Sequence, residues 1–480
     1  MSGGHSHSHR PGDDEATASV SVSALARVAL TALVVLAAAA TLFGVVRFWP
    51  SDAGAAGRVG TTDFAAPGVT FPLAEVLDVL PACAGPDTST GAPTAPGQGA
   101  DVAETGATCG AIRVQLEHPT ASSGDVHPTV TVAVPPPVSE SGLRAGDTVQ
   151  LMRTPPAQGQ PEGFSFLQVQ RGAPLSLMLG LFVLVVALVA RWRGILALVG
   201  LGFGGLVVAR FMLPALLEGQ SGLLVAVVGS SAIMFVVLYL AHGLSIRTST
   251  ALAGTLFGVG ITAGLGLLAV DLARLSGVAD DEGATLSSFV TTLHPQELLT
   301  CAIIVAGLGV LNDVTITQSS AVWELRAAAP SMGRRELFRS GMRIGRDHIA
   351  STIYTIVFAY AGAALPVLML LFLYERPVLD LLQTESLSEE IVRTLASAIG
   401  LVLAVPVTTA IAALTVGAAD VRPGATGVDG SRDGQHDTAV ATERTDAMRP
   451  VGPTAADLEL AAGGPPPPRT RAEARARGGA

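Results

Sequence analysis

Apolar residues gather in eight runs along the chain, and each run approaches the length of a membrane-spanning helix. A hydrocarbon core about 30 Å thick takes about 20 apolar residues in a helix. The pattern therefore predicts a predominantly α-helical polytopic membrane protein with about eight transmembrane helices, of which the last seven form a membrane domain over 174–418. The runs lie at 24–46, 174–190, 195–217, 222–241, 250–271, 297–317, 350–373 and 394–418.

The first apolar run is too long for a cleavable signal peptide, whose apolar region has about 7–15 residues. Arginine, phenylalanine, tryptophan and proline follow it at 47–50, and aromatic side chains are enriched at the membrane–water interface. We therefore expect a retained transmembrane helix over 24–48. The polar segment 1–23 and the Gly-, Pro- and Arg-rich segment 420–480 are predicted to be disordered tails.

Between the first two runs the pattern changes to an alternation of apolar and polar residues. It is clearest in 112–116, and it returns in 130–134 and 149–151. Alternation with period two, bounded by Gly and Pro, is typical of half-buried β-strands. We therefore predict a small β-rich domain of four or five strands within 50–172, outside the cytoplasm for the reason that follows.

The charges decide the orientation. Only 14% of the 480 residues are charged and 49% are hydrophobic, and the formal net charge is −10, which argues against nucleic-acid binding. All 29 basic residues are arginine. Nine of them lie in the loops after the second, fourth and sixth runs, which share one side if there are eight spans. Because positive residues favour the cytoplasmic side, both termini are predicted to be cytoplasmic and 50–172 to face outward.

Two of the three cysteines, Cys83 and Cys109, lie in the segment that is predicted to face outward. Disulfides persist in oxidising compartments outside the cytoplasm. We predict that these two cysteines form a disulfide bond, the alternative being two separate buried thiols.

One predicted helix carries an unusual number of polar residues. Its purely apolar part, Leu298–Leu311, spans about 21 Å, so the helix crosses the membrane only if it takes Asn312, Asp313, Thr315 and Thr317 inside. We place Asp313 about one helical turn inside the cytoplasmic boundary. An intramembrane acid costs about 3 kcal/mol at mid-depth, and it usually faces a bundle interior or an aqueous cavity.

These polar residues divide between two neighbouring helix faces. Asp313, Thr317 and Ser320 share one face by their i, i+4, i+7 spacing, and Asn312 and Thr315 lie on the next. Two interpretations remain open. The stripe is a site for an ion, a proton or a substrate, or it forms hydrogen bonds to neighbouring helices.

Two further candidate residues lie at the same side of the predicted bundle. Asp347 begins the seventh predicted helix, where it could face Asp313 or pair with an arginine of the preceding loop. His242 ends the fourth predicted helix. The chain has no phosphate-binding loop, no HExxH or CxxC motif and no serine elbow. We therefore expect no enzyme activity, no cofactor and no metal site.

Three groups of residues occur in a specific order along the membrane domain. They are Ala241–Ser245 with Gly254-Thr255, then Gly307–Val314 with Glu324-Leu325, and then Gly345–Asp347 with Ala359–Gly362 and Leu365-Pro366. In this order they resemble the YibE/F-like family of bacterial multi-pass membrane proteins, over roughly 100–420. The resemblance implies a multi-pass protein of the bacterial cell membrane, and it brings no established substrate or reaction.

Two functional hypotheses follow. The first is a transporter or permease-like protein with a polar site between the sixth and seventh helices, for an ion or small molecule that the sequence does not specify. The alternative is a non-transporting envelope protein that binds a partner through its outer β domain. In both, the surrounding partner is the lipid bilayer.

Overall fold

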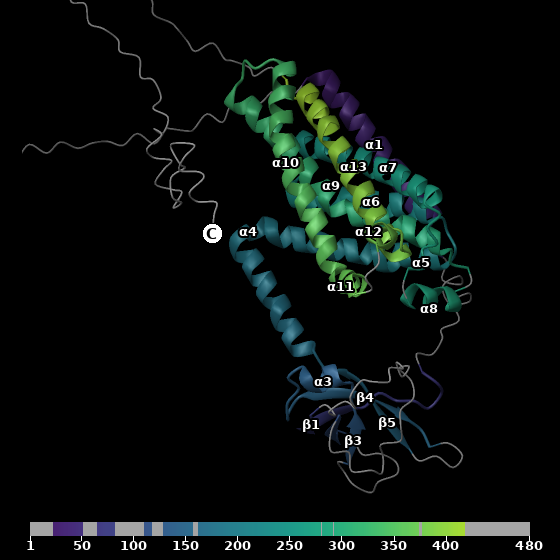
Figure 1. The fold of residues 1–480 in the computed structure, drawn as a ribbon. Helices are drawn as coiled ribbons and strands as arrows, with labels where there is room; N and C mark the ends of the chain where they lie inside the picture. The colour runs from purple at the N-terminus through teal and green to yellow at the C-terminus, as the bar shows by residue number, and fades with distance from the viewer. Residues whose placement is uncertain are drawn as a thin grey trace, which may run out of the picture. The chain divides into compact units, whose positions relative to one another are not determined.

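The computed structural model describes residues 23–50, 65–81, 110–117, 128–156, 162–279, 281–290, 292–373 and 377–417 (Figure 1). The two predicted tails lie outside these ranges apart from Ser23, and so do Cys83 and Cys109. The disulfide between these cysteines stays a prediction. The backbone N–H of Gly110 donates to the carbonyl oxygen of Pro81 at 2.6 Å, and these two residues flank the segment that contains both cysteines.

The β-rich segment forms one antiparallel sheet of five strands, which confirms the predicted number. In β1, Ala74 and Val76 are fully buried and Glu75 between them is exposed, which is the alternation that the sequence indicates. The two outer strands, β3 and β5, also contact one another, so the sheet is curled. The strands are β1 (Leu73–Val79), β2 (Ala111–Leu116), β3 (Thr129–Ala133), β4 (Thr148–Thr154) and β5 (Gly163–Val169), in the order β3-β2-β1-β4-β5, with the short helix α3 (Pro136–Glu140) between β3 and β4.

Helices make up the rest of the described chain. The long ones are α1 (Ala24–Arg47), α4 (Gly172–Val207), α6 (Gly222–His242), α7 (Ile246–Leu272), α9 (Pro295–Ala328), α10 (Arg334–Ala363) and α13 (Glu385–Thr415). The short ones are η1 (Val208–Met212), α5 (Leu213–Leu217), α8 (Asp281–Phe289), α11 (Leu365–Leu373) and α12 (Val378–Leu382). Six stretches are long and apolar enough to cross a membrane, and α10 with α11 makes a seventh that is bent by 64°. The described chain is therefore that of a membrane protein.

One of these stretches is too long for a single crossing. From α4 through η1 to α5 it has 46 residues, or about 69 Å at 1.5 Å per residue, which is more than twice the hydrocarbon thickness. The helix breaks at Arg191, whose backbone has φ 53° and ψ −138°. The break separates the stretch into two arms, which correspond to the predicted runs 174–190 and 195–217.

The connection between α9 and α10 is shorter than predicted. The sequence indicates a long loop over 318–349, whereas α9 continues to Ala328, α10 begins at Arg334, and only 329–333 connects them. The difference has a simple cause. The residues concerned are rich in arginine and other polar helix formers, so the helices continue where the apolar pattern stops.

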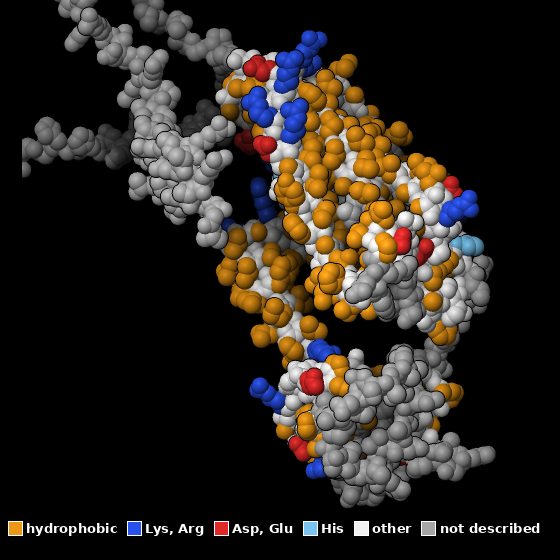
Figure 2. All heavy atoms as spheres, in the orientation of Figure 1, with side chains coloured by type: hydrophobic (Ala, Val, Ile, Leu, Met, Phe, Trp, Pro, Cys, Tyr) orange, Lys and Arg blue, Asp and Glu red, His pale blue; other side chains and the backbone are white. Residues whose placement is uncertain are grey.

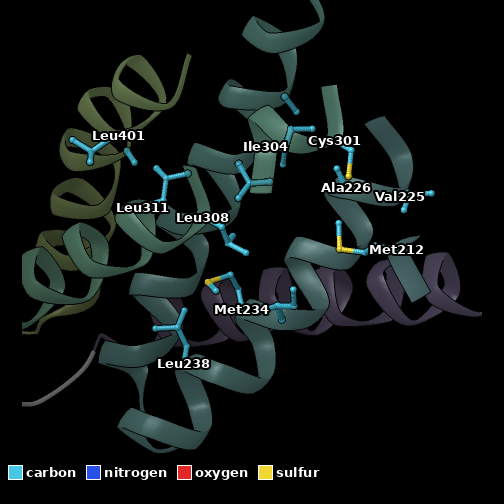
Figure 3. Packing of buried hydrophobic residues seen from close by; sticks show 14 of the residues in the cluster. Met212, Val225, Ala226, Met234, Leu238, Cys301, Ile304, Leu308, Leu311 and Leu401 are labelled. Atoms are coloured by element: carbon cyan, nitrogen blue, oxygen red, sulfur yellow. The ribbon is translucent and has the colours of Figure 1, made fainter. Parts of the chain in front are cut away.

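The centre of the bundle is formed by α7, α9 and α13, with α6 packed beside α9. Figure 3 shows Met234 of α6, Leu308 of α9 and Leu401 of α13 in one hydrophobic cluster. Glycines let these helices approach closely. A Cβ atom on Gly254 would overlap Oγ1 of Thr408 in α13, and one on Gly258 would lie 2.6 Å from Cδ2 of Leu311 in α9. Gly260 has no atom within 4 Å of such a Cβ position. Gly254 and Gly258 therefore serve close helix packing, and Gly260 does not.

The outside of the bundle is largely apolar. Figure 2 shows hydrophobic side chains spread over the outer helices, with arginines gathered at the end where α10 begins. Phe358 of α10 and Phe372 of α11 are 74% and 81% exposed. Large apolar side chains exposed over whole helices are expected against lipid and unfavourable against water.

Candidate functional site

The most unusual polar contact in the bundle joins α9 to α10. The carboxylate of Asp313 lies 4.0 Å from Nε2 of His348, and the Asp313 side chain is 68% exposed. The hydroxyl of Thr317, one turn further along α9, lies 3.4 Å from the same imidazole nitrogen and donates to the Asp313 carbonyl oxygen. An acid, an imidazole and a hydroxyl therefore meet in one place.

A contact between α9 and α7 gives the position of this cluster along the bundle. The hydroxyl of Ser319 donates to the backbone oxygen of Arg247 at 2.8 Å, which places Ser319 level with the start of α7. Asp313 precedes Ser319 by six residues, which is about 9 Å along the helix. Asp313 therefore lies about 9 Å from the level of the start of α7, measured along α9.

The face of α9 that carries Asp313 has no bulky side chain along most of its length. Ala302, Ala306 and Gly309 precede Asp313 on this face, and Thr317 and Ser320 follow it. Gly309, Asp313 and Thr317 are exposed, and the remainder of the face is at least partly accessible.

The matching face of α10 has the same character. From His348, spacings of three, seven, eleven and fourteen residues lead to Ser351, Thr355, Ala359 and Gly362, all of them exposed. Two stripes of small or polar residues therefore accompany the Asp313–His348 contact toward the end of α10.

The second predicted face of the polar stripe points into the protein. Thr315 is fully buried, and its hydroxyl lies 2.6 Å from that of Thr255 in α7. Asn312 is partly buried, and its Oδ1 has no hydrogen-bond partner within the described residues. For Thr315, the structure supports the packing interpretation of the sequence analysis.

The structure brings His348, and not Asp347, to Asp313. Asp347 is exposed, and no ion pair of it occurs in the described part of the chain. Successive residues of a helix differ by about 100° in direction, so a neighbour of His348 cannot share its contact. His242 is exposed at the end of α6, before Gly243 with φ 76°, and no described contact links it to Asp313.

Gln318, a further polar residue near this cluster, is not indicated by the sequence. Gln318 of α9 is buried against α10 and α13. Its amide donates to the carbonyl oxygen of Gly341 at 2.8 Å and to Oγ1 of Thr409 at 2.7 Å. Gly345 lies against the same side chain, because a Cβ there would be 3.0 Å from Oε1 of Gln318. These hydrogen bonds tie α10 to α9 and α13. They thereby set the position of His348 on α10.

Two cavities lie away from the Asp313 cluster. The first is an apolar cleft of 290 Å³ between α10 and α13, which Tyr360 and Glu390 also line. Glu390 forms an ion pair with Arg393 at 2.6 Å. The second is a polar pocket of 630 Å³ between the end of α7 and the start of α9. No group of three or more His, Cys, Asp or Glu side chains suited to a metal ion occurs among the described residues.

The fold and the polar cluster thus define a helical membrane protein with an acid and an imidazole in contact between two of its helices. The family model of the YibE/F-like proteins matches residues 178–418, and the chain belongs to this family. The match covers the helices from α4 to α13 and includes both Asp313 and His348. Neither the curated proteins nor the solved structures contain a significant match.

Proposed function

We propose that the chain is a transporter of protons or small cations, and that Asp313 and His348 form its site between the sixth and seventh spans. The exposed carboxylate of Asp313 carries the proposal. A charge is unfavourable in hydrocarbon, and acids that occur within membrane spans usually line a water-filled path or a binding site. A carboxylate accepts hydrogen bonds and an imidazole has two ring nitrogens that can donate or accept, so the pair offers polar atoms to a proton or a small cation.

The two small-residue stripes support the same proposal. Small and hydroxylated side chains leave room for water or a hydrated ion, and they supply oxygen atoms that can bind a cation. The stripes on α9 and α10 extend from the Asp313–His348 contact, so they outline a path along the two helices.

The first prediction concerns the charge of Asp313. The full-length protein in liposomes should move protons when a membrane potential is imposed, and a pH-sensitive dye inside the vesicles measures the rate. Asp313→Asn removes the charge and retains the shape, so it should lower the rate by about tenfold or more. His348→Gln should lower it similarly.

Asp347→Asn is the matched control, because it removes an exposed carboxylate from the residue next to His348. It should leave the rate unchanged. Equal rates for wild type, Asp313→Asn and Asp347→Asn would refute the proposed site, as would the absence of flux with protons, sodium and potassium.

We further propose eight membrane spans with both termini in the cytoplasm. The count treats the two arms on either side of Arg191 as separate spans, and α10 with α11 as one. An even count is supported by the hydrogen bond from the N–H of Ser23 to the carbonyl oxygen of Thr415 at 3.2 Å, which joins the start of α1 to the end of α13. The arginines near this end support a position on the cytoplasmic side of a bacterial membrane.

The second prediction tests this orientation. In a variant without native cysteines, a cysteine in place of Arg335 in α10 should react with a membrane-impermeant maleimide only after the cells are opened. A cysteine in place of Ser139 in α3 should react in intact cells. Labelling of position 335 in intact cells would refute the proposed orientation.

A further inference from the structure

A polar pocket of 630 Å³ lies where α7 ends and α9 begins. Its volume falls within the range of about 300–1,000 Å³ that is usual for small-molecule sites. Thr300 lines it, and Thr300 and Asp313 are thirteen residues apart on α9, so they point in roughly opposite directions. The pocket is therefore separate from the proposed transport site. Its polar lining consists of Asp271, Arg274, His294, Gln296, Glu297 and Thr300.

Arg274 occupies an unusual backbone position in this pocket. The N–H of Leu275 donates to the carbonyl oxygen of Val270 at 3.1 Å, and that of Arg274 to the carbonyl oxygen of Asp271 at 3.2 Å. This pair of bonds is the Schellman arrangement that ends a helix, and its left-handed residue is most often glycine. Here the residue is Arg274, with φ 53°. An arginine therefore occupies a position whose left-handed backbone conformation favours glycine.

The backbone around Arg274 is held firmly. Leu275 is only 2% exposed, and its carbonyl oxygen accepts a hydrogen bond of 2.9 Å from the Gln296 amide. The N–H and the hydroxyl of Ser276 both donate to the carboxylate of Glu385 in α13. The wall that carries Arg274 is thus fixed to both α9 and α13, which is the support that a preformed binding site requires.

The charges of the pocket are available to a ligand. Asp271 and Arg274 are exposed, and in the described ranges neither side chain forms an ion pair. Glu297 is already engaged, because its carboxylate accepts a hydrogen bond of 2.6 Å from the first N–H of α6, that of Gly222. The pocket therefore presents one unpaired cation and one unpaired anion.

We propose that this pocket binds a small zwitterion of about dipeptide size, with Arg274 on its carboxylate and Asp271 on its ammonium group. A guanidinium can bind a carboxylate through two parallel hydrogen bonds. A simple anion would meet Asp271 and Glu297, and a simple cation would meet Arg274, so a ligand with both charges is the best complement. The proposal is independent of transport through the Asp313 site.

Three matched probes test the proposal on the full-length protein in lipid nanodiscs. Dialanine carries both charges, N-acetyl-dialanine carries only the carboxylate, and dialanine amide carries only the ammonium. A ligand that binds only the folded protein raises its melting temperature. Dialanine should raise it, and each of the other two probes should bind at least about tenfold more weakly, because each lacks one charge-assisted hydrogen-bonding group.

Variants of Arg274 separate binding from stability. Arg274→Gly should raise the melting temperature of the ligand-free protein, because glycine adopts the left-handed backbone without strain, and it should abolish the effect of dialanine. Arg274→Lys keeps the charge and should retain weaker binding. Arg191→Gly is the matched control, because it also replaces an arginine with positive φ and lies outside the pocket lining. It should raise the melting temperature and leave dialanine binding unchanged.

Three results would overturn the proposal. They are the absence of a shift with dialanine, equal binding of dialanine and N-acetyl-dialanine, and unchanged dialanine binding by Arg274→Gly. Asp271→Asn provides a further measurement, since it should weaken the binding of dialanine, whose ammonium group loses its partner, and should not weaken the binding of N-acetyl-dialanine, which has no ammonium group. Failure of these tests would not affect the proton-flux result for Asp313→Asn.

Discussion

Replacing Gly254 with alanine is expected to destabilise the bundle by about 3 kcal/mol, the upper part of the range for overpacked cores. The new methyl group would overlap the hydroxyl of Thr408. Thr408 cannot turn away easily, because it is fully buried and its hydroxyl donates to the Ala404 carbonyl oxygen at 2.8 Å. Relief therefore requires α7 and α13 to separate. Thermal unfolding of the purified protein in detergent measures the loss.

Gly260 provides the control within the same helix. A Cβ at this position meets no atom within 4 Å, and alanine has a higher helix propensity than glycine. Gly260→Ala should therefore unfold at the same temperature as the wild type or a higher one. If both alanine variants lost stability equally, close packing at Gly254 would not be the cause.

A buried charge in place of Gln318 is expected to have the other large effect. Gln318→Glu would aim a carboxylate at the carbonyl oxygen of Gly341 and would remove the donor to Thr409, at a cost of more than about 3 kcal/mol. Gln318→Leu removes the same two hydrogen bonds without adding a charge, so it should cost about 2 kcal/mol. The expected order of melting temperatures is wild type, then Leu, then Glu.

Gln383→Glu is the appropriate control, because it makes the same chemical change at an exposed position at the end of α12. It should leave the melting temperature unchanged. If Gln318→Leu were as stable as the wild type, the amide would not hold α10 in place. The proton-flux assay adds a second measurement, since a shift of α10 would also displace His348 from Asp313.

The sequence predicts the membrane class, the strands and the region of the polar site, because these depend on local patterns. The apolar runs and the alternation of 112–116 can be recognised without knowing any neighbour. The expectation that Asp313 lies within the membrane rests on a length argument alone, since the apolar part of its helix is too short to cross the bilayer. The sequence does not predict the contact between Asp313 and α10.

The partners within the site depend on which helix lies beyond each face. Asp347 and His348 are adjacent, and the choice between them as the neighbour of Asp313 depends on the rotation of α10. Gln318 follows Thr317 directly, yet Thr317 is exposed and Gln318 is buried. A single sequence shows both as polar residues of one helix. Only the packing of α10 and α13 distinguishes them.

The three-helix centre also has a consequence for the biosynthesis of the protein. The spaces beside Gly254 in α7 and Gly307 in α9 are filled by side chains of α13, Thr408 and Ser397, and Gly400 of α13 receives Thr262 in return. Because α13 follows α7 and α9 along the chain, both of these helices are synthesised before their common partner. The faces of α7 and α9 that pack against α13 therefore form before their partner, and a chain that stops before residue 385 lacks the side chains that fill the spaces beside Gly254 and Gly307.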